Sequence, residues 1–399
     1  MRKWEKALSL VLILAMMFSF TACASKETGE KLEGITAGDT IKIGFVGFLS
    51  GAEAYLGQSA KLALEDYVNE LNEAGGVTGK KVELIAYDIG MDPNTEIVNA
   101  CNRLIQQDKV VAIIGPESTE QAMIAIPIMN NAKVPMIVTT ASNQLVTVDE
   151  NGKLNPYMFR MCFIDPYQGV ALANFAFNEL NLRKTAFLGD VTNIYCEGIQ
   201  NFYREEFEKL GGKVVSEEGM MATDVDFRAQ LTSISESGAD SLLLATGSYK
   251  VVSFVAKQIK QLGIDIQLLG VDGWYAKELL DLAGQELEGA FMTNMVSDDD
   301  PMFEDYIEQF TKKHPGVTPN VYAYYALDAM MSIVHSIKEA GVANSVAIAE
   351  QLSVMKDVPV FTGTLTMEPD THNPHNRTVS IIEVKDSKFT TYRLYTPED

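Results

Sequence analysis

The sequence predicts an α/β protein with two lobes, each built on a mostly parallel sheet. Short apolar runs rich in β-branched residues alternate with segments whose apolar residues recur at helical spacing. Repeated strand–helix units favour parallel sheets with helices on both faces. The alternation starts afresh near the middle of the chain, and each run has on the order of 100 residues, the usual size of a domain, which indicates two lobes.

The first run of alternating elements supplies the first predicted sheet. Asp92 and Pro93 form an N-cap followed by a proline. Ser118 and Gln121 have the spacing of a capping box, so a helix should begin at Ser118. Strands are expected over residues 41–47, 82–87, 110–114, 135–139 and 157–163, and helices over residues 57–73, 93–107 and 118–132.

The second run supplies the second predicted sheet. Its first helix is expected to have Asp165 as the cap, Pro166 next and Gln168 three residues on. Strands are then expected over residues 186–189, 214–217, 241–245 and 267–271, and helices over residues 195–210, 227–237 and 251–262. Helices around residues 302–313 and 322–340 follow, and residues 379–394 alternate like a hairpin that turns at residues 386–387.

The composition excludes several classes of partner. The chain has 399 residues, 47% of them hydrophobic, and a formal net charge of −22. Such an acidic chain is not expected to bind nucleic acid or an anionic membrane surface. Cys101, Cys162 and Cys196 lack metal-ligand spacing, and Cys101 and Cys162 are expected in the core. His372 and His375 are expected in a solvated turn. We therefore expect neither a metal nor a cofactor.

The first 22 residues resemble a lipoprotein signal peptide. A basic start precedes an apolar segment, residues 7–20, that is too short for a membrane span. Thr-Ala-Cys at residues 21–23 resembles a bacterial lipobox, although Phe20 replaces the usual leucine. The resemblance implies that Cys23 is lipidated and anchors an extracytoplasmic protein at the outer face of the cytoplasmic membrane or in the periplasm. Ordinary signal cleavage is the alternative, and polar residues 23–40 are expected to be a flexible tether.

Hydroxyl side chains follow two of the predicted strands. Ser118 and Thr119 come after one strand, and Thr139, Thr140 and Ser142 come after the next. Ligands of open α/β sheets bind outside the carboxyl ends of the strands, and a helix N-terminus favours a negative group. The pattern therefore indicates a socket for a small anionic or zwitterionic ligand. Ordinary helix capping explains the same hydroxyls equally well.

The order of several motifs resembles the branched-chain amino-acid-binding proteins of ABC importers, which have the type I periplasmic-binding fold. The resemblance covers residues 41–384. In chain order, its motifs are residues 41–88, AIIGPESTEQ, VPMIVTTASN, the turn at 165–169, LLGVDGW and LEGAFMT. It implies two Rossmann-like lobes joined by three crossings, near Phe163, Val296 and His372. Lobe 1 would comprise residues 41–163 and 297–372, and lobe 2 residues 164–296 and 373–399.

The resemblance also implies which residues hold the backbone groups of an amino acid. Ser118 and Thr119 would bind the α-carboxylate. In the segment Thr140–Ala141–Ser142, the Thr140 carbonyl would accept from the α-ammonium and Ser142 would bind either group. Asp272 in the second lobe would neutralise the ammonium. The alternative for Asp272 is a turn-forming aspartate before glycine.

A further set of residues matches the side-chain pocket of the family. Tyr55 and Tyr195 match aromatic or apolar walls, although either could be a packing tyrosine. Members often carry tyrosine at the position of Ser248, where Tyr249 follows and could substitute. Trp274 lies beside Asp272, and Tyr322 is a weaker candidate.

The resemblance implies a monomeric solute-binding lipoprotein that binds a branched-chain or other apolar amino acid. It would deliver this ligand to an ABC permease and ATPase complex and contact the membrane only through its lipid. The alternative is a sensory module for an amino acid or a small amide; such a module is usually fused to a transmembrane helix and a signalling domain, which this sequence does not contain. An enzyme is not expected, because no nucleophile–base constellation is evident.

Overall fold

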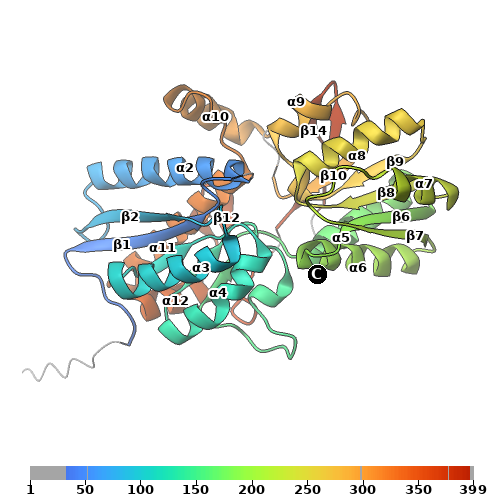
Figure 1. Ribbon diagram of the computed structural model, residues 1–399. Helices are drawn as coiled ribbons and strands as arrows, with labels where there is room; N and C mark the ends of the chain where they lie inside the picture. The colour runs from blue at the N-terminus through green and yellow to red at the C-terminus, as the bar shows by residue number, and fades with distance from the viewer. Residues whose placement is uncertain (1–32, 52, 297–298, 376, 396–399) are drawn as a thin grey trace, which may run out of the picture. The chain divides into compact units, whose positions relative to one another are not determined.

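The first sheet has five parallel strands in the order β2-β1-β3-β4-β5. Figure 1 labels β1 and β2 of this sheet, which lie side by side. The computed structural model describes residues 33–51, 53–296, 299–375 and 377–395. The strands are β1 (Thr40–Gly47), β2 (Lys81–Asp88), β3 (Ala112–Ile114), β4 (Met136–Val138) and β5 (Met158–Arg160). Their connecting helices are α2 (Ala54–Glu73), α3 (Pro93–Arg103) and α4 (Thr119–Ala132), and a π-helical turn (Leu104–Asp108) extends α3.

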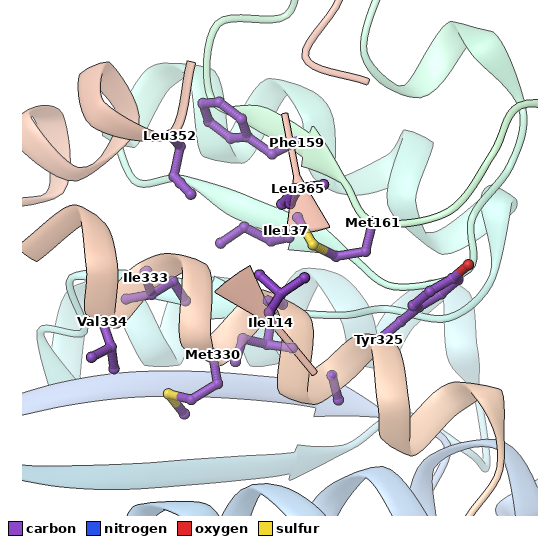
Figure 2. Close-up of a cluster of buried hydrophobic side chains, with 14 of the residues drawn as sticks. Ile114, Ile137, Phe159, Met161, Tyr325, Met330, Ile333, Val334, Leu352 and Leu365 are labelled. Carbon is purple, nitrogen blue, oxygen red and sulfur yellow. The ribbon is translucent and has the colours of Figure 1, made fainter. Parts of the chain in front are cut away.

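Both faces of this sheet are covered, as a buried parallel sheet requires. Helices α11 (Val321–Ala340) and α12 (Ser345–Ser353), from late in the chain, share one core with α2 and the sheet. Ile114 and Ile137 belong to this core, which Figure 2 shows against Met330 and Ile333 of α11. The neighbouring Ile113 belongs to a second core shared with α3 and α4. The two faces therefore alternate along the strand, with the period of two expected for β-structure.

The second sheet has seven strands in the order β14-β13-β10-β9-β8-β6-β7. Its parallel strands are β6 (Lys184–Asp190), β7 (Lys213–Met220), β8 (Ser241–Ala245), β9 (Gln267–Gly270) and β10 (Phe291–Asn294). An antiparallel hairpin of β13 (Val379–Lys385) and β14 (Lys388–Tyr395) extends one edge. The helices of this region are α5 (Asp165–Asn174), α6 (Ile194–Lys209), α7 (Arg228–Glu236), α8 (Tyr249–Leu262) and α9 (Lys277–Ala283).

The chain passes between the two sheets three times, within one compact unit that begins at Gly34. It leaves the first sheet after β5 and the second sheet after β10. It then forms α10 (Pro301–Lys313), α11, α12 and a small pair of strands, β11 (Val358–Val360) and β12 (Gly363–Leu365), before it enters β13. The exact lobe boundaries remain a prediction. The predicted signal peptide, the predicted lipidation site at Cys23 and most of the predicted tether lie outside the described residues.

Some local predictions are wrong. Ser118 is the N-cap residue of α4 but its side chain makes no capping bond, and the Gln121 side chain donates to Asn94 Oδ1 at 2.6 Å, so no capping box forms. The N-cap of α5 is Ile164, and Asp165 is the first residue of the helix and is fully buried. Helices α9 and α12 were not predicted; they are short, with 7 and 9 residues.

His372 does not lie in a solvated turn. It is only 3% exposed, its ring stacks on Phe159 with a 4.1 Å centroid separation, and its Nδ1 lies 3.0 Å from the Met158 carbonyl oxygen. In the described part of the chain, no group of His, Cys, Asp or Glu is arranged to hold a metal ion. None of the described helices has the length and apolar character that crossing a membrane requires.

Candidate ligand-binding site

A cavity of about 100 Å³ lies where loops from the carboxyl ends of both sheets meet. Glycines let these loops approach closely. A Cβ at Gly115, after β3, would lie 2.1 Å from the Val46 carbonyl oxygen, and one at Gly273 would lie 2.7 Å from Gly247 Cα. The lining residues are Glu53, Leu56, Glu117, Ser118, Thr119, Thr140, Asn193, Tyr195, Gly247, Asp272, Gly273 and Tyr322.

The first wall of the cavity is the start of α4 and the loop after β4. Ser118 is the N-cap residue of α4 and Thr119 its first residue, so backbone N–H groups of the first helical turn lie at this wall. Thr140 Oγ1 donates to the Glu117 carbonyl at 2.9 Å, which ties the two loops together. A helix N-terminus with hydroxyls beside it favours a negative ligand group.

The second wall is built around Asp272, at the end of β9. Asp272 Oδ1 accepts from Tyr195 Oη and from Gln168 Nε2, both at 2.5 Å. Gln168 also donates to Thr293 Oγ1 at 2.8 Å, and this second hydrogen bond fixes the orientation of the amide that contacts Asp272. Desolvation raises the pKa of Asp272, and the hydrogen bonds from Tyr195 and Gln168 oppose that shift. This wall therefore presents an oriented carboxylate, which suits a positive ligand group.

A tyrosine joins the two walls beside the cavity. Tyr55 of α2 donates to the Gly247 carbonyl, which follows β8, at 3.4 Å. Its ring also meets Tyr249 edge-on at 5.2 Å between centroids and Tyr322 at 6.4 Å. Residues packed with the first sheet thus contact the second-sheet loops directly.

Glu117 is the least expected residue of the site. It directly precedes the hydroxyl pair and is only 4% exposed. The backbone N–H groups of Phe48 and of Glu117 itself lower its pKa, but burial is the larger effect and raises it to about 8. Among the described residues, no group forms a well-aligned hydrogen bond with either carboxylate oxygen.

The structure brings together only part of the predicted site. Ser118, Thr119, Thr140, Tyr195 and Asp272 line the cavity. Tyr55, Ser248 and Tyr249 line a neighbouring hollow that shares Glu53 and Gly247 with it.

The remaining predicted residues are engaged elsewhere. The Trp274 indole is fully buried and donates to the Leu244 carbonyl at 3.1 Å. The Ala141 carbonyl accepts from Arg160 at 2.6 Å, and Ser142 is fully buried with its carbonyl bound to the Asp165 N–H at 3.0 Å. None of these three lines the cavity.

Sequence reasoning missed Glu53, Glu117, Asn193, Gly247 and Gln168 as site or supporting residues. A signal existed for Glu117, because it directly precedes Ser118 and Thr119 after a predicted strand. Gln168 was assigned to the capping of α5. No local signature predicts its contact with Asp272, which spans 104 residues of sequence.

The chain belongs to the periplasmic binding protein family, whose sequence profile matches residues 40–388. It is similar to an amino acid binding protein of Pseudomonas aeruginosa, with 29% identity over 327 residues that cover 81% of this chain and 84% of that protein. It is also similar to the leucine-, isoleucine-, valine-, threonine- and alanine-binding protein of the same organism, with 28% identity over 79% of this chain and 83% of that one.

A solved structure agrees with these relatives. The branched-chain amino acid transporter substrate-binding protein of Streptococcus pneumoniae, in complex with isoleucine, matches with a TM-score of 0.81 and 26% identity, covering 90% of this chain and 100% of that one. The predicted family and its type I periplasmic-binding fold are confirmed. The family and these neighbours are extracytoplasmic solute-binding proteins and not enzymes.

Proposed function

We propose that this protein binds a free amino acid between its two lobes and delivers it to the permease and ATPase of an ABC importer. One observation carries the proposal: a helix N-terminus at Ser118 and Thr119 and an oriented carboxylate at Asp272 line the same cavity from two different sheets. An α-carboxylate suits the first wall and an α-ammonium suits the second. The names of the relatives, which bind amino acids, support the same ligand class.

The experiment is calorimetry of the protein with an amino acid panel and with matched analogues of the tightest ligand. One analogue lacks the α-ammonium and the other has its α-carboxylate replaced by hydrogen. Each should bind at least about 30-fold more weakly, since truncating one partner of a buried charge pair costs roughly 2–5 kcal/mol. A deaminated analogue that binds as tightly as its parent amino acid would contradict the proposal.

We further propose that Cys23 carries the lipid that keeps the protein at the membrane. The basic start, the apolar segment and the Thr-Ala-Cys sequence support this. Replacing Cys23 with serine should release the protein into the soluble fraction, because stable anchoring needs acyl chains. Cell fractionation tests it, with Ser25→Ala as the control. A Cys23→Ser protein that stays with the membranes would refute the lipid anchor.

A further inference from the structure

The cavity between the two walls is small for a whole amino acid. Its volume is about 100 Å³, whereas ligand pockets usually measure roughly 300–1,000 Å³. Its walls suit an α-carboxylate and an α-ammonium, and among its described lining residues Leu56 is the only Leu, Ile, Val or Met. A ligand whose backbone groups occupy both walls would therefore have to place a large side chain in a neighbouring space.

A larger hollow of about 340 Å³ adjoins the cavity at Gly247. Gly247 follows β8 and lines both spaces. A Cβ on Gly247 would meet no heavy atom of the described residues within 4 Å, apart from its two chain neighbours, so the space beside its Cα is open. The Gly247 carbonyl accepts the hydrogen bond from Tyr55, and this contact leaves the space beside the Cα free. The hollow is therefore within reach of a side chain that starts in the cavity.

The hollow has an aromatic lining. Tyr55 of α2 and Tyr249 of α8 meet there edge-on, with 5.2 Å between their ring centroids, and Phe254 of α8 is the third aromatic residue. Tyr249 and Phe254 are partly buried against the core of the second sheet. Aromatic rings at separations of this kind attract one another beyond the effect of buried area alone. A further ring, brought by a ligand, would extend this cluster.

We propose that the preferred ligand is an amino acid with an aromatic side chain, which passes Gly247 and packs against Tyr55 and Tyr249 in the hollow. The inference rests on the proposed function, because it assumes that the backbone groups of an amino acid fill the cavity. Gly247 then determines specificity, since any side chain at this position would obstruct the passage. A ligand as small as alanine would fit the cavity but make no contact in the hollow.

The test is titration calorimetry with phenylalanine, tyrosine, leucine and alanine as ligands. We expect phenylalanine or tyrosine to bind about ten-fold or more tightly than leucine and alanine. Gly247→Ala should weaken the aromatic ligand at least ten-fold and leave the affinity for alanine within three-fold. The substitution is compatible with the fold, because Gly247 does not have the left-handed backbone conformation that favours glycine and its Cβ would have room.

A second variant, Tyr249→Leu, removes a ring of the hollow and keeps an apolar side chain. It should reduce the preference for phenylalanine over leucine at least three-fold. The matched control is Gly38→Ala, which adds a methyl group at a glycine with equally free space, before the amino end of β1. It should change no affinity.

Leucine or alanine binding as tightly as the best aromatic ligand would overturn the inference. A Gly247→Ala protein whose affinities for the aromatic ligand and for alanine are unchanged, or fall equally, would do the same, as would an unchanged preference in Tyr249→Leu. If leucine or alanine binds best and α-deamination abolishes its binding, the proposed function survives and only this inference fails. If no amino acid binds, both fail.

Discussion

Asp272 and Glu117, the two buried acidic residues that line the cavity, differ in the hydrogen bonds that their carboxyl groups receive. Asp272 receives two hydrogen bonds, from Tyr195 and Gln168, and Gln168 is fixed in turn by Thr293. Glu117 receives no well-aligned hydrogen bond from the described residues. An oriented carboxylate offers a fixed contact to the ammonium that every amino acid carries, so we expect Asp272 to bind that group. Burial instead favours the protonated, neutral form of Glu117.

The largest effect is expected when the Asp272 carboxylate is removed. Asp272→Ala should weaken every amino acid ligand by about 30-fold or more, because the α-ammonium loses its countercharge at a cost of roughly 2–5 kcal/mol. Calorimetry measures it, and Asp265→Ala, an exposed aspartate of the same region, is the control. Affinities within three-fold of the wild-type values would remove Asp272 from the site.

A smaller effect should follow when Asp272 is kept but one of the hydrogen bonds to its carboxylate is removed. Tyr195→Phe deletes one hydrogen bond to Oδ1, worth about 1.5–3 kcal/mol to a charged group. Because this bond lowers the pKa of Asp272, its loss should raise that pKa. Affinity should then begin to fall at a higher pH as the solution is acidified. Titrations between pH 5 and pH 8 test this, and a pH profile identical to that of the wild-type protein would show that Tyr195 does not position the carboxylate.

Glu117 should make the stability of the ligand-free protein depend on pH. Its pKa rises from an ordinary value of 4.5 to about 8 in the folded chain. Between these values the unfolded chain is ionised while the folded chain keeps the proton. The free energy of unfolding should therefore fall as pH rises through this window, by at most about 1.4 kcal/mol per pH unit.

Glu117→Gln should remove this contribution to the pH dependence. The free energy of unfolding of the variant should therefore increase relative to that of the wild-type protein from pH 5 to pH 8. Urea unfolding at pH 5, 6.5 and 8 measures the difference, and Glu120→Gln should keep the wild-type slope. A Glu117→Gln variant with an unchanged slope would show that Glu117 is ionised in the folded protein throughout this range.

The contrast also shows what sequence could predict. The alternating elements follow from local periodicity, and the strand-end hydroxyls follow from the rule that ligands bind outside the carboxyl ends of parallel strands. Asp272 came from the family resemblance. Its partners did not, because the Gln168–Asp272 and Tyr195–Asp272 contacts join residues 104 and 77 positions apart.

Burial was the other quantity that sequence did not reveal. Trp274 beside Asp272 matched a ligand-pocket position, yet its ring is fully buried and its indole N–H binds Leu244. Glu117 was not among the predicted site residues, and a buried glutamate is not expected from sequence because glutamate is rarely buried without a partner. His372 was assigned to solvent because of its polar neighbours, although it stacks on Phe159. In each case tertiary packing decided the environment.

We expect a single amino acid to satisfy both walls of the cavity at once. Neither wall alone can match both charges of an amino acid, so the ligand should favour the state in which the lobes meet, and only this difference in affinity can shift the equilibrium. Small-angle scattering with and without the tightest ligand of the panel is the direct measurement. The radius of gyration should fall on saturation in the wild-type protein and stay unchanged in Asp272→Ala at the same ligand concentration. A wild-type radius that does not fall would contradict ligand-driven closure.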